Sequence, residues 1–445
     1  MVILSLIGII FSIIIGYWRP VRLGWIVFMV EPLLGPNRFT LIPSLMLPLN
    51  IDRIAFFLTL GILFRFLNRK FPFKKILKSK TIVFAVIFSL FYLIVSAQEL
   101  FFYFTYLPNM FFAFVLPFLV IRDKKDIFRL SQIFYFHTII ISLFILLEYT
   151  TGFNIALTIM KTNPTVNPGT LYTGDILESM AEGRGGQFRV AGLFGHPVNT
   201  GFRMAFLLPI SLWYAIKKGP IHKIIFSFIL FSFILLQTRM AILSFMLSLF
   251  IIFRKLSVKY FFIAIFSLFV ILFTFYLIPF TNDFIQLFWS SSFSDLLDFS
   301  NDPYTISRIV RILSGIQLFV NNPIYGYGSP GYVYYELLGS ADINSPLIYL
   351  LSGGIGMFIM YLGIILSILI STNKITKLKF IARREKDFIN FIFAGFFAGF
   401  FVVLSNWTED HFLIIFIMYM AIYKAYYFLP KISIQYLQEK SNILA

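Results

Sequence analysis

The sequence contains no cysteine among its 445 residues, and charged residues make up only 13% of it. The absence of cysteine excludes disulfides, iron–sulfur clusters, thiolate zinc sites and cysteine nucleophiles. Apolar residues make up 59% of the chain and give it a mean hydropathy of +0.86. Because soluble domains carry about 25% charged residues, this composition excludes an ordinary soluble protein.

Long apolar runs occupy most of the chain, and many reach the roughly 17–20 residues that a helix needs to cross a bilayer. The alternating segments of about 10 residues that make membrane-spanning strands are absent. The sequence therefore predicts an all-α polytopic integral membrane protein, with a single membrane domain over 1–445. We expect about 12 transmembrane helices. They lie near 2–18, 51–66, 81–97, 101–121, 131–149, 196–216, 224–237, 240–253, 261–279, 343–372, 388–405 and 412–429.

Basic residues outnumber acidic ones by 37 to 20, which gives a formal net charge of +17. They concentrate in every second connection between apolar runs, such as "NRKFPFKKILKSK" and "NKITKLKFIARREK". Nucleic-acid binding needs a basic face on a soluble surface, so we expect no nucleic-acid partner. The positive-inside rule instead places these connections and the tail, 430–445, in the cytoplasm.

The first 50 residues are harder to thread. Residues 1–18 lack both a basic start and a small-residue cleavage pattern, so we interpret them as a retained membrane segment rather than a signal peptide. Arg19 and Arg22 favour a cytoplasmic end for this segment, whereas the alternation from residue 51 places them outside. Residues 23–50 contain Glu31 and several prolines, a pattern that fits either a connection or a short or re-entrant crossing. The sequence therefore leaves the side of the N-terminus open.

Two connections, 150–195 and 280–342, are much longer than turns, and both fall on the extracytoplasmic side of the predicted topology. Long connections in compact proteins are usually functional or disordered. These two contain many aromatic and apolar residues. We therefore expect two long extracytoplasmic loops that form partly helical caps over a membrane cavity.

Several arginines lie on this outer side, where the other charges are mainly acidic. They are Arg184, Arg189, Arg203, Arg239, Arg308 and Arg311. Ionisable groups at membrane depth are costly and therefore functional candidates. The guanidinium group is a rigid fork of donors that suits phosphate oxygens. The set predicts a site for an anionic phosphate that arrives in the bilayer, such as a lipid-linked pyrophosphate. The alternative is that the arginines pair with the outer acids or reach the lipid headgroups.

The stretch "SRIVRILSGIQLFVNNPIYGYG" resembles the outer-loop signature of the bacterial O-antigen ligase/polymerase superfamily. That signature is an arginine, an apolar helix, a proline and a G-x-G turn, and here Arg308, Pro323, Gly326 and Gly328 match it. The family's usual tryptophan four residues after the arginine is replaced by Ile312.

Two further motifs carry the resemblance, which covers roughly residues 185–360. "QTRMA" is similar to a short family hairpin with a central arginine, matched by Arg239. "FRVAGLFGHPVNTG" resembles the segment that leads into the next membrane helix. Its matching residues are Arg189, Gly192, Phe194, His196 and Pro197.

One departure separates two branches of this family. Its ligases carry a His-Asn pair at the start of the helix after the second long loop, followed by G-x-x-G. In "DINSPLIYLLSGGIGM" Asn344 and Gly354 are kept, but the histidine position is Ile343 and the last glycine position is Met357. The resemblance therefore implies the polymerase branch, which joins repeat units on the lipid carrier.

The resemblance implies a metal-independent glycosyltransferase of the bacterial cytoplasmic (inner) membrane, without cofactor, that polymerises oligosaccharides on undecaprenyl pyrophosphate at the extracytoplasmic face. Arg189, Arg239, Arg308 and Arg311 are the candidate pyrophosphate ligands. Asp342 or Glu409 is the candidate base. The remaining candidate substrate contacts are His196, Arg203 and Asn344. Partners expected besides membrane lipid are a chain-length regulator and a flippase.

Each candidate also has a purely structural interpretation. Asp342 could be an acidic residue at a helix N-terminus, where the helix dipole favours negative charge. Glu409 could lie in a solvated turn, and His196 could form a structural hydrogen bond. Two rival functions stay open: an O-antigen ligase that transfers glycan to lipid A-core, and a lipid-linked oligosaccharide flippase or other transporter. Transporters often show inverted repeats and interrupted helices, and no internal repeat is evident here.

Overall fold

The computed structural model describes a helical protein. The described residues are 2–34, 40–42, 49–67, 79–95, 112–154, 190–194, 197–236, 238–253, 303–333, 337–338, 345–378, 381–405 and 412–430. Their main helices are α1 (Val2–Trp18), α2 (Pro20–Leu34), α3 (Ile51–Leu67), α5 (Lys80–Val95), α7 (Lys124–Thr151), α10 (Pro197–Lys218), α11 (Pro220–Leu235), α12 (Arg239–Phe253), α16 (Pro303–Asn321), α17 (Pro330–Tyr332), α18 (Ser345–Thr376), α19 (Arg383–Ser405) and α20 (Phe412–Tyr423). Residues 112–120 are also helical, Gly192–Phe194 form a 3-10 turn, and a π turn, Lys424–Phe428, continues α20.

The predicted all-α architecture is confirmed for this part of the chain. Helices occupy the described parts of the predicted apolar segments, whereas 101–111 and 261–279 lie outside the described residues. Three helices, α7, α18 and α19, are long and apolar enough to cross a membrane. Several shorter helices are apolar as well. These helices support a membrane protein, whereas the count of 12 crossings and the side of each loop stay predictions.

The uncertain stretch between residues 20 and 50 contains a helix and a small sheet. Helix α2 follows α1 almost directly and buries Glu31 and Pro32. Strands β1 (Thr40–Ile42) and β2 (Leu49–Asn50) pair antiparallel, an element that the apolar pattern did not predict.

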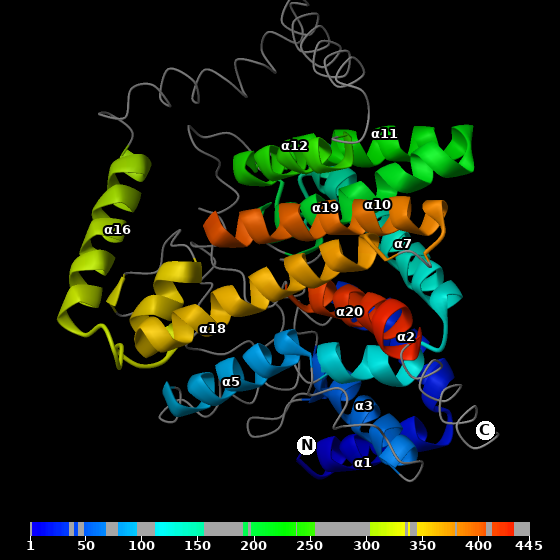
Figure 1. Cartoon of the computed structure of the whole chain (residues 1–445), viewed down its shortest axis with the longest axis horizontal. Coiled ribbons are helices and arrows are strands. Elements are labelled where there is room, and N and C mark those ends of the chain that lie inside the picture. The colour runs from blue at the N-terminus through cyan, green and yellow to red at the C-terminus, as the bar shows by residue number, and fades with distance from the viewer. Residues whose placement is uncertain are drawn as a thin grey trace, which may run out of the picture.

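Helix α10 packs against four other helices, α7, α11, α12 and α19 (Figure 1). It is buried on nearly all sides, including the polar side chains of Thr200, Arg203 and Ser211. Gly395 of α19 faces the backbone of Phe206, where an added Cβ would come within 2.5 Å of the Phe206 carbonyl oxygen. The rings of Phe206 and Phe396 stack with their centroids 5.8 Å apart. Close backbone contact therefore fixes α19 against α10.

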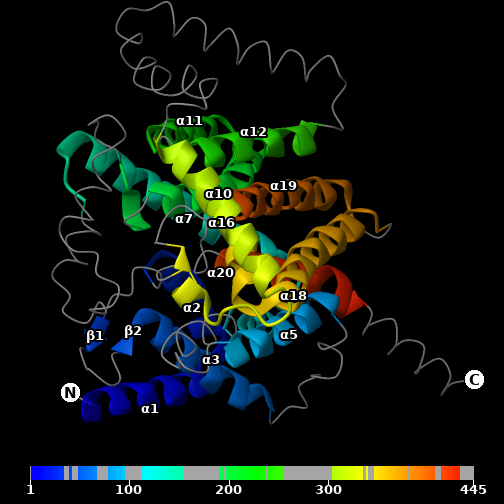
Figure 2. The same ribbon diagram turned by 90° about the vertical axis from the view of Figure 1, so that its left-hand side faces the viewer.

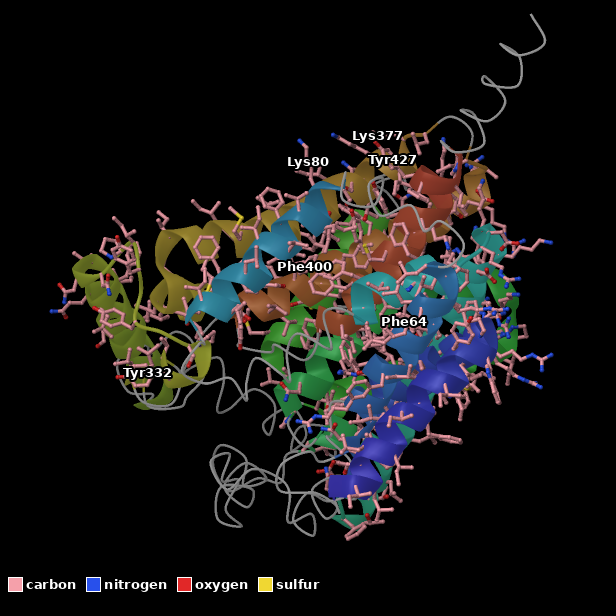
Figure 3. All side chains as sticks on the ribbon, turned by 90° about the horizontal axis from the view of Figure 1, so that it is seen from below. Phe64, Lys80, Tyr332, Lys377, Phe400 and Tyr427 are labelled. Carbon is pink, nitrogen blue, oxygen red and sulfur yellow. The ribbon has the colours of Figure 1, made fainter. Side chains whose placement is uncertain are left out.

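Basic helix ends gather at one end of the bundle, here called the basic end. At the start of α7, Lys124 forms an ion pair of 3.0 Å with Glu385 at the start of α19. At the end of α10, Lys217 lies 3.8 Å from Asp387 of α19. Figure 3 shows Lys80 and Lys377 near each other, far from Tyr332. This clustering agrees with the alternation of basic connections along the sequence.

The opposite end of the bundle holds the last turn of α7 and the first turns of α10, α12 and α18. Helix α16 lies at this end and runs across the direction of α18 and α19 (Figures 1 and 2). It packs against α18. Four predicted site residues lie in described helices that meet at this opposite end: Arg203 in α10, Arg239 in α12, and Arg308 and Arg311 in α16.

Glycines allow α1 and α3 to pack closely, which gives a first prediction. A Cβ at Gly61 would overlap the backbone of Ile13 in α1. We expect Gly61→Val to push the helices apart and to lower the free energy of unfolding by about 1–3 kcal/mol, the usual cost of overpacking. Thermal unfolding of the purified protein in detergent measures this. Leu67→Ala, at a side chain that is 41% exposed, is the control, and an equal loss in both variants would contradict the close contact.

Candidate functional site

The predicted site residues divide into three groups. Five lie outside the described residues: Arg189, His196, Asp342, Asn344 and Glu409. Three lie in described helices, although their side chains are not described: Arg239, Arg308 and Arg311. Arg203 has a described side chain. The structure therefore bears on the site mainly through the elements that carry these residues.

The segment Val190–Phe194, called the return segment, leads from the first long connection into α10. Glu148, in the last turn of α7 and only 2% exposed, binds it through both carboxylate oxygens. Its Oε1 accepts the Ala191 N–H at 2.9 Å, and its Oε2 accepts the Gly192 N–H at 2.7 Å. The carboxylate thus satisfies two backbone donors that would otherwise be buried without partners.

Helix α10 holds the return segment from the other side. The Thr200 hydroxyl donates to the Ala191 carbonyl at 2.6 Å. Gly192 has a φ of +70°, and a Cβ there would lie 2.8 Å from the Thr200 methyl group. The segment that directly follows Arg189 is therefore fixed to α7 and α10 at once.

Arg203 joins three elements inside the bundle. Its side chain is 1% exposed, and its Nη1 donates to the Pro32 carbonyl of α2. Its guanidinium carbon lies 4.0 Å from the centroid of the Phe194 ring in the return segment. A desolvated cation over an aromatic face is stabilised by about 2 kcal/mol. These contacts give Arg203 a positioning role, and the substrate contact predicted for it stays a prediction.

A second buried side chain, besides Arg203, binds a backbone carbonyl of α2. His137 of α7, 1% exposed, pairs through Nε2 with the Met29 carbonyl at 2.9 Å. Met29 and Pro32 lie one turn apart on α2. Buried polar groups must find partners inside the protein, and here they fasten α2 to α7 and α10.

Helix α12 begins with Arg239 beside the first turn of α10. The Thr238 hydroxyl donates to the Pro197 carbonyl at 3.1 Å. Gly201 permits this approach, because a Cβ there would lie 3.0 Å from the Thr238 side chain. The backbone of Arg239 is thus placed close to the start of α10, near the return segment.

The turn after α16, Asn322–Gly328, docks into a break in α18. Gly353 and Gly354 leave the helical conformation there, with φ of −124° and +64°. The Tyr327 N–H donates to the Leu351 carbonyl at 2.7 Å. The Gly328 N–H donates to the Ser352 carbonyl at 3.2 Å, and the Ile355 N–H donates to the Pro323 carbonyl at 2.9 Å. Backbone groups released by the break are therefore satisfied by the turn.

Glycine is required on both sides of this contact. Gly326 has a φ of +69°, and a Cβ there would overlap the Ser352 carbonyl. A Cβ at Gly354 would overlap the Ile324 carbonyl. The Tyr327 hydroxyl also donates to the Leu318 carbonyl at 2.7 Å, which ties the turn to α16. The helix that carries Arg308 and Arg311 is thus anchored to α18.

Sequence reasoning missed two of these features. Glu148 is an acid inside an apolar helix, and such residues are functional candidates by default. The adjacent Gly353 and Gly354 are the sequence signal for the break in α18, whereas the family motif matches Gly354 alone. Among the described residues, no three His, Asp or Glu side chains are grouped to hold a metal ion.

Comparison of the chain with protein-family models finds no match, and comparison with curated proteins finds no significant match. The proposal of a function therefore rests on the sequence motifs and on the geometry of the opposite end.

The Glu148 contacts predict a stability loss. Glu148→Gln keeps one acceptor but turns an amide donor toward a backbone N–H. Since hydrogen bonds to charged groups contribute about 1.5–3 kcal/mol, we expect the free energy of unfolding to fall by a similar amount. Thermal unfolding in detergent provides the measurement. Glu385→Gln breaks a partly exposed ion pair worth about 0–1 kcal/mol, and a loss no larger than this for Glu148→Gln would argue against the two bonds.

The break in α18 gives a separate prediction. Gly354→Ala forces a strained backbone worth about 1–3 kcal/mol and a collision with Ile324. We expect faster limited proteolysis within the 322–328 turn and a lower thermal stability. Gly356→Ala is the matched control, because its added Cβ meets the side-chain ring of Phe91 at 3.1 Å rather than backbone. Equal proteolysis rates in the two variants would refute the docking of the turn.

Proposed function

We propose that this protein is a membrane glycosyltransferase that polymerises oligosaccharide repeat units carried on undecaprenyl pyrophosphate. The observation that supports this most is the docking of the Asn322–Gly328 turn into the break of α18. It anchors α16, with Arg308 and Arg311, across the end of the bundle where α10 and α12 begin (Figure 2). Arg239 is the first residue of α12.

The proposed site is on the extracytoplasmic side of the bacterial cytoplasmic membrane. The basic end, where Lys124 and Lys217 lie, then faces the cytoplasm, in line with the positive-inside rule. The opposite end, with α16 lying across it, faces the periplasmic water and the outer lipid headgroups. A lipid-linked pyrophosphate presents its charge at this depth.

The proposed reaction depends mainly on stabilising the negative charge of the leaving group, and it needs no covalent enzyme intermediate. A sugar hydroxyl of one repeat unit attacks the anomeric carbon of another, the bond from that carbon to the pyrophosphate oxygen breaks, and undecaprenyl pyrophosphate leaves. Arg189, Arg239, Arg308 and Arg311 stabilise the charge that develops on the leaving group. Asp342 or Glu409 takes the proton of the attacking hydroxyl, a step typically worth about 10²–10⁴-fold. No metal or nucleotide sugar takes part in this scheme.

The test is the glycan product of purified protein in liposomes that contain lipid pyrophosphate-linked repeat units. Wild-type protein should extend them into a ladder of longer lipid-linked chains. We expect Arg308→Ala to slow this extension by about 10²–10³-fold, the usual cost of losing one preorganised donor. Arg239→Ala should behave alike.

Arg383→Ala, at the basic end, removes the same charge from a position far from the proposed site and should keep the wild-type ladder. Size-exclusion profiles and thermal unfolding verify that each variant is folded. Full chain length in folded Arg308→Ala would refute the arginine site. Unchanged single units with wild-type protein would refute the polymerase, and an added lipid A-core acceptor would then test for ligation.

A further inference from the structure

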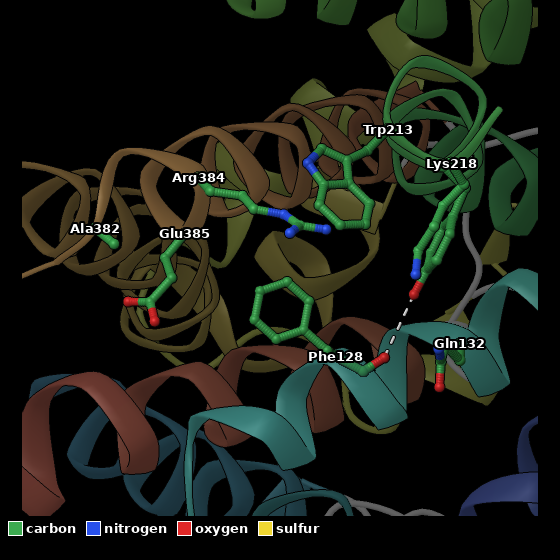
Figure 4. A pocket seen from close by; sticks show the side chains of 8 residues that line it. Phe128, Gln132, Trp213, Lys218, Ala382, Arg384 and Glu385 are labelled. Atoms are coloured by element: carbon green, nitrogen blue, oxygen red, sulfur yellow. Dashed lines mark hydrogen bonds between the residues drawn. The ribbon is translucent and has the colours of Figure 1, made fainter.

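A cavity of about 370 Å³ opens at the basic end, between the starts of α7 and α19 and the end of α10 (Figure 4). It is lined by Phe128, Gln132, Trp213, Tyr214, Lys218, Ala382, Arg384 and Glu385. Its volume falls within the roughly 300–1,000 Å³ of small-molecule sites. The proposed glycosyltransferase site uses none of these residues, so the cavity is a separate feature of the fold.

The buried wall of the cavity contains a donor that lacks an acceptor. Trp213 is 1% exposed, and its indole N–H has no hydrogen-bond partner in the described part of the chain. Packing holds the indole in place, with ring centroids 4.7 Å from Phe388 and 5.9 Å from Phe128. In Figure 4 the nitrogen-bearing edge of the indole lies on the side of Arg384. Native proteins rarely leave such a donor unsatisfied, so an acceptor from outside the chain is expected.

The charges around the cavity favour an anion. Glu385 is engaged by Lys124 at 3.0 Å, and nearby Asp387 is engaged by Lys217 at 3.8 Å. Arg384 and Lys218 also line the cavity, and neither forms an ion pair with another described residue. Glu385 and Asp387 are therefore each paired with another lysine, whereas the described residues supply no acidic partner to Arg384 or Lys218.

The N-terminus of α19 is a third feature that favours an anion in the cavity. Ala382 precedes this helix and lines the cavity, and alanine has no side-chain oxygen to accept the first amide protons of α19. The positive end of the helix dipole thus points toward the same space. Backbone amides at a helix start, a guanidinium and an indole N–H are all donors that suit phosphate oxygens.

We infer that this cavity binds a phosphate group, carried either by the headgroup of an anionic phospholipid or by a soluble phosphate compound. Arg384 and Lys218 bind it electrostatically, and the Trp213 N–H binds it from the buried wall. Basic pockets between membrane helices on the cytoplasmic side commonly take anionic lipid headgroups. This inference does not depend on the proposed glycosyltransferase activity.

The experiment uses the full-length protein purified in detergent and stripped of lipid. Native mass spectrometry measures the retention of added phosphatidylglycerol and phosphatidylcholine. Thermal unfolding with inorganic phosphate or chloride, at equal ionic strength, tests the soluble source. We expect wild-type protein to retain phosphatidylglycerol about tenfold better than Arg384→Gln or Lys218→Gln, a difference typical of one charge-assisted contact. Trp213→Phe keeps an aromatic ring without the N–H and should weaken retention too.

Arg383→Gln is the matched control. Arg383 carries the same charge and is next to Arg384 in the sequence, but it does not line the cavity. Selective retention of phosphatidylglycerol that depends on Arg384 but not on Arg383 establishes the lipid as the source. Stabilisation by inorganic phosphate with the same dependence, but without lipid retention, establishes the soluble source. Equal effects of Arg384→Gln and Arg383→Gln, or unchanged binding of both probes by Trp213→Phe, would overturn the inference.

Discussion

Backbone hydrogen bonding is the constraint on which the opposite end of this bundle depends. Within a bilayer, no water satisfies exposed carbonyl and amide groups, so a broken helix is tolerated only where protein supplies the partners. The break at Gly353 and Gly354 releases the carbonyls of Leu351 and Ser352, and the turn after α16 donates to both. The break in α18 is therefore stable only while the turn is docked, and the turn is held in place by the break. The placement of α16 across the bundle follows from this contact.

Buried ionisable groups form the second set of connections at this end. Glu148 and Arg203 are almost fully buried, and each binds backbone groups of another element. Charged groups in such surroundings are costly unless they are paired. The protein uses them where the chain leaves regular helix, so that polar backbone at the return segment and at α2 is satisfied by side chains.

Most of the helices could be predicted from the sequence, because a membrane segment is specified locally by apolar length. Helix α7 begins at Lys124, earlier than the apolar run at 131, because the Asp123 side chain caps it by accepting the Asp126 N–H at 3.0 Å. For helix α2 the sequence left only a short or re-entrant crossing open within 23–50, since Glu31 and Pro32 interrupt its apolar pattern. Its stability comes from contacts with distant residues, His137 and Arg203, which no local pattern reveals.

The candidate site shows the same division. The G-x-G turn and its arginine-bearing helix could be recognised from the sequence, but their docking into α18 could not, because it joins segments through backbone bonds that carry no side-chain signature. The Glu148 contact was equally hidden, since it links an acid to main-chain amides more than 40 residues later. The side chains that would bind pyrophosphate stay predictions.

The return segment has a consequence for how this protein could diversify. The Asn154 side chain donates to the Gly192 carbonyl at 3.0 Å, so the chain leaves α7 and returns to α10 at almost the same place. Closing a longer loop costs only about 0.6 kcal/mol for each doubling of its length. The connection between these anchors can therefore gain, lose or exchange residues during evolution while the helices beneath it keep their positions. Related proteins built on this bundle are free to vary that connection without refolding the membrane part.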